Sequence, residues 1–149
     1  MSDGPRDTDV QWWHSKGKLA PVERLGSLMT LREFQREAHA IAVEKGWWDQ
    51  ERNIGEVVAL IHSEISEALE EYRKYGPDGI KALRWVPVMT NDARYAGLSK
   101  PEGFFVELAD AVIRIADLFE RYGVSMEDVI RAKMAYNRTR PYRHGGKQA

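Results

Sequence analysis

The sequence predicts an all-α fold, arranged like a four-helix bundle. Apolar residues recur at helical spacing in four segments, capping residues or glycines bound these segments, and no sustained alternation typical of strands is found. A length of 149 residues fits one ordinary domain. We expect an irregular arm over residues 1–29, a single α-helical domain over residues 30–140 and a basic tail over residues 141–149.

The four predicted helices run from Thr30 to Gly46, from Asn53 to Tyr75, from a start between Ser99 and Gly103 to Gly123, and from Ser125 to about Tyr136. Thr30 with Glu33 has the spacing of a capping box. Residues 76–102 contain three glycines and three prolines, so we expect a loop insert there. The first and third helices carry more apolar surface than a small bundle hides, which predicts a homodimer or homotetramer.

Composition excludes several classes of protein. The chain has 22 Lys and Arg against 23 Asp and Glu, whereas non-specific nucleic-acid binders usually carry a basic excess. It has no cysteine, which excludes disulfides, thiolate nucleophiles and cysteine-ligated metal sites. No apolar run approaches the roughly 20 residues that span a bilayer. We therefore expect a cytoplasmic protein with neither a membrane nor a nucleic-acid partner.

Two pairs of acidic residues mark the candidate site. Glu64 and Glu67 are three residues apart on the second predicted helix, and Glu107 and Asp110 repeat this spacing on the third. Both pairs border apolar stripes, so the two helices can converge four carboxylates on one point. All-oxygen ligands favour Mg²⁺, or Mn²⁺, over zinc. A di-iron site does not fit, because no histidine follows a glutamate by three residues. The alternative is that both pairs are solvated surface charges.

These motifs together resemble the MazG-like all-α nucleoside triphosphate pyrophosphohydrolases. The resemblance covers about residues 30–145 and rests on Glu-x-x-Glu at 64–67, Glu-x-x-Asp at 107–110, Lys-x-x-x-Asn at 133–137 and the run Arg-Pro-Tyr-Arg-His-Gly from 140. It implies a MazG-type helical oligomer in which Glu64, Glu67, Glu107 and Asp110 hold Mg²⁺ and do the catalysis. Ser63 departs from the family, which often has a further glutamate there; that role is absent or belongs to Glu71.

The resemblance also implies substrate contacts. Lys133 and Asn137 lie one helical turn apart and, with Arg140, would contact phosphates. Alone, this segment also fits a solvated C-terminus. Trp48 can stack on a nucleobase, although a core or interface role is the alternative.

We therefore expect hydrolysis of a nucleoside or deoxynucleoside triphosphate to the monophosphate and pyrophosphate, as in house-cleaning of nucleotide pools. One alternative is a hydrolase of another pyrophosphate-bearing nucleotide, such as phosphoribosyl-ATP. The other is a non-catalytic helical module that binds nucleotide or oligomerises.

Overall fold

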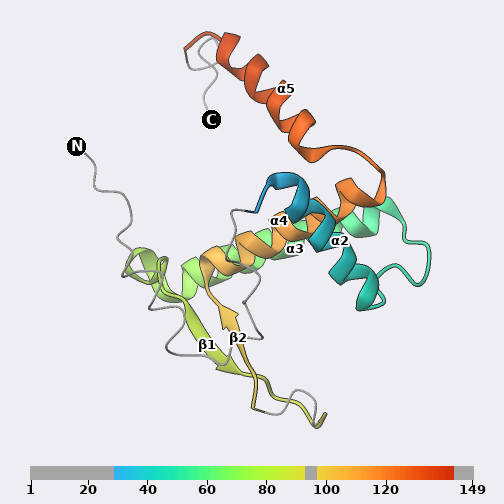
Figure 1. Cartoon of the computed structure of the whole chain (residues 1–149). Coiled ribbons are helices and arrows are strands. Elements are labelled where there is room, and N and C mark those ends of the chain that lie inside the picture. Colours follow the sequence, from blue (N-terminus) through green and yellow to red (C-terminus); the bar gives the residue numbers. More distant parts are fainter. Residues whose placement is uncertain (1–28, 93–96, 143–149) are drawn as a thin grey trace. The chain divides into compact units, whose positions relative to one another are not determined.

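The computed structural model describes residues 29–92 and 97–142, and this part of the chain is mostly helical (Figure 1). Its elements are α2 (Leu31–Glu44), α3 (Ile54–Gly79), β1 (Arg84–Pro87), β2 (Ser99–Glu102), α4 (Phe104–Arg121) and α5 (Met126–Thr139). The four predicted helices are confirmed. The expected arm and basic tail lie almost entirely outside the described residues.

The described residues form two compact units. The hairpin unit comprises residues 63–92 and 97–110. The other unit, which we call the three-helix unit after α2, α4 and α5, comprises residues 29–62 and 111–142 and includes the first residues of α3. The boundaries fall within α3 and α4, so each of these helices contributes to both units.

The segment expected as a loop insert contains a short hairpin that the sequence did not predict. Residues 84–87 and 99–102 form a two-stranded antiparallel sheet, with Arg84 opposite Glu102 and Val86 opposite Lys100 (Figure 1). Strands of four residues are too short to show a clear alternation of polar and apolar residues. Pro87 and Pro101 lower the strand signal further, but a two-stranded sheet has only edge strands, which tolerate proline.

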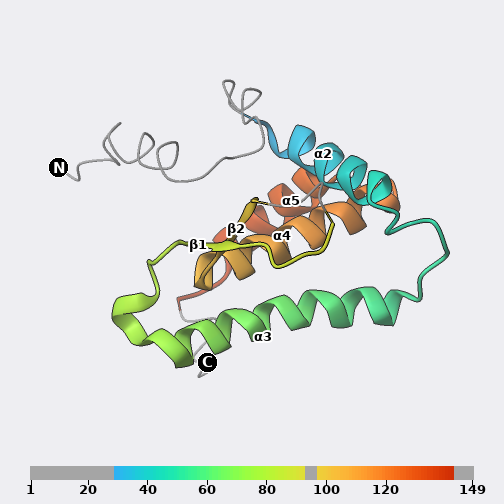
Figure 2. The same ribbon diagram turned by 90° about the horizontal axis from the view of Figure 1, so that it is seen from below.

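The predicted end of the second helix at Tyr75 is close to the observed break. Gly76 has φ 66° and ψ −172°, outside the helical region, and a further helical turn follows through Gly79. Glycine adopts positive φ without a steric penalty, and Pro77 can begin the new turn because its missing N–H is not needed there. The change of direction at the end of α3 is visible in Figure 2.

The three-helix unit has a small apolar core. Ala38 of α2, Ala116 of α4 and Met126 of α5 are buried, and larger side chains pack around them: Leu31, Phe34, Ile115, Phe119 and Ile130. Two caps fix where its helices begin. The capping box of Thr30 and Glu33 is present, and the Ser125 hydroxyl accepts a hydrogen bond from the backbone N–H of Asp128.

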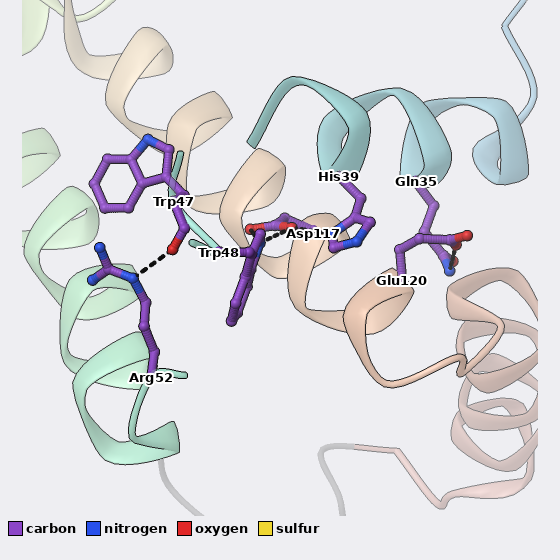
Figure 3. Close-up of polar contacts among 7 residues, drawn as sticks. All are labelled: Gln35, His39, Trp47, Trp48, Arg52, Asp117 and Glu120. Carbon is purple, nitrogen blue, oxygen red and sulfur yellow. Dashed lines mark hydrogen bonds and ion pairs between the residues drawn. The ribbon is translucent and has the colours of Figure 1, made fainter. Parts of the chain in front are cut away.

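Gln35 connects α2, α4 and α5 within this unit. Its amide nitrogen donates to Glu120 Oε2 at 2.5 Å and to the carbonyl of Val124 at 3.0 Å, while its amide oxygen accepts from the N–H of Met126 at 2.8 Å. Gln35 is only 5% exposed. It therefore holds the turn between α4 and α5 through hydrogen bonds from α2. Figure 3 shows its contact with Glu120.

Candidate metal centre

Three carboxylates of the hairpin unit meet at one point. One side-chain oxygen each from Glu64, Glu107 and Asp110 lies within 4.8 Å of the others. Glu64 comes from α3 and is only 7% exposed, whereas Glu107 and Asp110 are half-buried residues of α4. The predicted convergence of acidic residues from two helices is thus observed for three of the four.

Glu67, the fourth predicted ligand, is exposed and does not belong to this group. It is nevertheless near enough to act on Glu107 electrostatically. The pKa of Glu107 is raised, first by burial and then by the negative charges of Glu67, Asp110, Glu64 and Glu71. A role for Glu67 in binding a metal therefore stays a prediction.

The donor set fits a hard divalent cation. Carboxylate oxygens are the ligands that Mg²⁺ and Mn²⁺ prefer, and a cation would relieve the repulsion that raises the pKa of Glu107. Glu64, Glu107 and Asp110 would hold such an ion. Three side chains leave coordination positions for water and for oxygens of a ligand.

Glu71 does not add a further open carboxylate to the centre. It forms an ion pair with Arg84 of β1, and the Arg84 guanidinium carbon lies 4.1 Å from the centre of the Tyr75 ring. The role of Arg84 could not be predicted from the sequence, because an arginine in a Gly- and Pro-rich insert has no periodic pattern that assigns it a partner. This ion pair disfavours the possibility that Glu71 takes the role of the family's additional glutamate.

An open apolar pocket of about 520 Å³ lies in the same unit as the carboxylates. Its lining comes from α3, the following turn and the start of α4: Ile65, Ser66, Ala68, Leu69, Tyr72, Ile80, Phe104 and Leu108. Ile65 directly follows Glu64, and Leu108 directly follows Glu107. The pocket can take an apolar or aromatic group, but it presents few polar atoms that would select one.

The predicted substrate residues all lie in the three-helix unit. Trp48 donates its indole N–H to both oxygens of Asp117, at 2.9 and 3.1 Å, and Nδ1 of His39 lies 2.7 Å from Asp117 Oδ1 (Figure 3). The indole N–H of Trp48 therefore already has a partner. The cluster of His39, Trp48 and Asp117 could not be predicted from the sequence, because Asp117 is 78 residues from His39 and 69 from Trp48.

On α5, Lys133 and Asn137 are both exposed. The Lys133 ammonium lies 5.0 Å from the centre of the Tyr136 ring. Arg140 follows the last helical residue, and its backbone N–H donates to the carbonyl of Asn137 at 3.2 Å. The expected helical spacing of Lys133 and Asn137 is confirmed, and their phosphate contacts stay predictions.

Comparisons with protein-family models, curated proteins and solved structures found no match for this chain. The resemblance to the MazG-like enzymes therefore rests on the motif residues alone. In the described residues no helix combines the length and the apolar character needed to cross a membrane.

Proposed function

We propose that the protein is a Mg²⁺-dependent nucleoside triphosphate pyrophosphohydrolase that converts an NTP or dNTP into the monophosphate and pyrophosphate. The observation that carries the proposal is the approach of Glu64, Glu107 and Asp110 to within 4.8 Å of one another. Three carboxylates at this distance repel one another unless a cation or protons compensate them. The MazG-like motif supplies the reaction class, and a house-cleaning role in the cytoplasm belongs to the same proposal.

The four acidic residues would have two roles, metal binding and proton acceptance. Glu64, Glu107 and Asp110 hold the ion, which when bound neutralises phosphate charge and polarises the phosphoryl group. Glu67 is exposed and lies outside the three-oxygen group, so its carboxylate can accept the proton of the attacking water. The water oxygen bonds to the α-phosphorus, the bond from this phosphorus to the bridging oxygen breaks, and pyrophosphate leaves.

The remaining motif residues are the candidates for substrate contacts. Lys133, Asn137 and Arg140 offer an ammonium, an amide and a guanidinium as donors to phosphate oxygens. The hydrogen bonds to Asp117 hold the Trp48 indole in one orientation, and the Arg121 guanidinium carbon lies 4.9 Å from the centre of its ring. A nucleobase would therefore stack on the ring face that Arg121 does not cover.

Self-association is part of the proposal. The predicted apolar stripe of the second helix is largely uncovered in the single chain: Val58, Ile65, Leu69 and Tyr72 are 40–48% exposed. Phe105 and Val112 of α4 are also exposed. Burying such surface against another copy is favourable, which supports a homodimer or homotetramer.

The test is incubation of the purified protein with each common NTP and dNTP, with Mg²⁺ and with EDTA, followed by ion-exchange separation of the products. We expect monophosphate and pyrophosphate, which disappear with EDTA or with Asp110→Asn. Glu70→Gln is the matched control, because Glu70 is an exposed glutamate of α3 that pairs with Arg73.

Other outcomes would identify the alternatives. Diphosphate and orthophosphate would show cleavage at the wrong bond. Turnover only of another pyrophosphate-bearing nucleotide, such as phosphoribosyl-ATP, would keep the reaction but change the substrate. Nucleotide binding without any product would identify the non-catalytic module.

A further inference from the structure

One face of the hairpin carries most of its charged side chains. Residues opposite each other in an antiparallel pair lie on the same face, and so do residues two apart along a strand. Arg84 faces Glu102 and Val86 faces Lys100 across the sheet. These four side chains therefore share one face, on which Arg84 and Lys100 are the two cations.

One residue of this face, Arg84, contacts the acidic row of α3. Glu64, Glu67 and Glu71 follow one another by three and four residues and so line one side of the helix. The ion pair of Arg84 with Glu71 joins the hairpin to the end of that row. Both side chains are mostly buried, with 26% and 17% exposed, so this contact fixes the hairpin more firmly than a surface pair would.

On the same face, the pair of Val86 and Lys100 is the next one after the pair of Arg84 and Glu102. The Lys100 ammonium lies 2.8 Å from Glu102 Oε1. The pKa of Lys100 is raised chiefly by Glu102, and the charges of Glu107 and Glu67 add to this effect. Lys100 thus lies in the electrostatic field of a carboxylate from each of the two helices that form the candidate metal centre.

The hairpin is also connected directly to α4 through the turn at Gly103. Strand β2 ends at Glu102, the buried Gly103 follows, and the N–H of Glu107 donates to the carbonyl of Gly103 at 3.1 Å. A side chain at position 103 has no room, because its Cβ would lie 2.5 Å from the carbonyl oxygen of Ala82. The position of the strand that carries Lys100 is therefore set by the same turn that begins the helix of Glu107.

We propose that Lys100 binds a phosphate group of the substrate beside the carboxylate centre. This inference rests on the proposed function and adds a phosphate-binding residue from the insert, which the family resemblance does not include. The ligand chemistry is that of a di- or triphosphate chain, here represented by inorganic pyrophosphate.

The charges explain why a lysine is useful at this position. A divalent ion on three ionised carboxylates leaves a net charge of about −1 (2 minus 3), so a further cation is needed nearby to attract the phosphate chain. An ammonium group is a compact charge that can contact several phosphate oxygens. The Lys100 side chain is 61% exposed, so it can exchange the weak surface pair with Glu102 for a phosphate.

The experiment measures two affinities on the full-length protein. Calorimetry gives the Kd of inorganic pyrophosphate with Mg²⁺ present, and electron paramagnetic resonance gives the Kd of Mn²⁺ without pyrophosphate. The variants are Lys100→Gln, Lys100→Arg and the control Lys81→Gln, which changes an exposed lysine of the same unit that lies before β1.

We expect Lys100→Gln to weaken pyrophosphate binding about tenfold, as expected for loss of a charged hydrogen bond. Lys100→Arg should stay within about threefold of the wild type, because the charge is kept. Mn²⁺ binding to Lys100→Gln should be unchanged or tighter, because a cation near the carboxylates has been removed. A merely structural role would weaken both affinities together.

Two results would overturn the inference. In the first, Lys100→Gln has the same Kd for pyrophosphate as the control Lys81→Gln. In the second, Lys100→Gln weakens the affinities for Mn²⁺ and for pyrophosphate by the same factor. If the wild type still binds Mn²⁺ and cleaves an NTP, only the role of Lys100 is wrong. If the wild type neither binds Mn²⁺ nor cleaves an NTP, both the proposed function and the role of Lys100 are wrong.

Discussion

Glu64 of α3 and Glu107 of α4 each place a carboxylate oxygen within 4.8 Å of the other, and Asp110 completes the group. The two glutamates are 43 positions apart in the sequence (107 minus 64) and belong to different helices. Glu64 is almost fully buried and lies beside two other carboxylates, so a divalent cation at this point would be attracted by three acidic side chains. The central claim is that a divalent metal ion compensates these charges.

Glu107→Gln should make the metal-free protein more stable at pH 7. The pKa of Glu107 is raised in the folded state, so the folded protein favours the protonated form, and its ionisation lowers stability as the pH rises above about 4.3, the ordinary pKa of glutamate. A neutral amide of the same shape removes this penalty. We expect the Tm in EDTA to rise by about 3 °C at pH 7, measured by circular dichroism.

The gain should shrink as the pH falls towards about 4.3 and be absent well below it, because Glu107 is then protonated in both the folded and unfolded states. Addition of Mn²⁺ should stabilise the wild type and leave Glu107→Gln almost unchanged. A variant that is less stable than the wild type in EDTA at pH 7 would show that the charge of Glu107 is already well compensated by protein groups.

Gln35→Ala should destabilise the protein. The substitution leaves the N–H of Met126 and the carbonyl of Val124 without their buried side-chain partner. Each such loss lowers stability by roughly 1–3 kcal/mol, so we expect the free energy of unfolding in urea to fall by about 3 kcal/mol. Gln50→Ala, at an exposed position, is the control and should change little. An equal effect of the two substitutions would contradict the role of Gln35.

The pair of Glu71 and Arg84 should show energetic coupling. Arg84→Met leaves a mostly buried carboxylate without its partner, so we expect a loss of about 2 kcal/mol in the free energy of unfolding. Glu71→Gln combined with Arg84→Met should lose less than the sum of the two single variants. Strict additivity in this double-mutant cycle would mean that the contact does not hold the hairpin.

Local signals explain why the helices could be predicted from the sequence. The capping box of Thr30 and Glu33, the cap at Ser125 and the stop at Gly76 depend on residues a few positions apart, and all three are present in the structure. The pairing of Glu107 with Asp110 is also local, because three residues make nearly one turn. Such features follow from helix geometry without knowledge of the fold.

Long-range contacts could not be predicted in the same way. Asp117 meets His39 across 78 residues and Trp48 across 69, and no spacing in the sequence indicates either contact. The hairpin was missed because each strand has four residues and includes a proline. Glu67 follows Glu64 by three residues, as Asp110 follows Glu107, so the local spacing alone could not show that Glu67 lies outside the group of three carboxylates. Its exposure depends on the positions of α4 and the hairpin.

The most direct test of the central claim is a titration of Mn²⁺ into the metal-free protein, followed by electron paramagnetic resonance, for the wild type, Asp110→Asn and the control Glu70→Gln. We predict a saturable site in the wild type and in Glu70→Gln, and at least tenfold weaker binding in Asp110→Asn, which loses one of three charged ligands. Equal Mn²⁺ affinity in Asp110→Asn and the wild type, or no saturable binding in the wild type, would contradict the claim that Glu64, Glu107 and Asp110 form a metal centre.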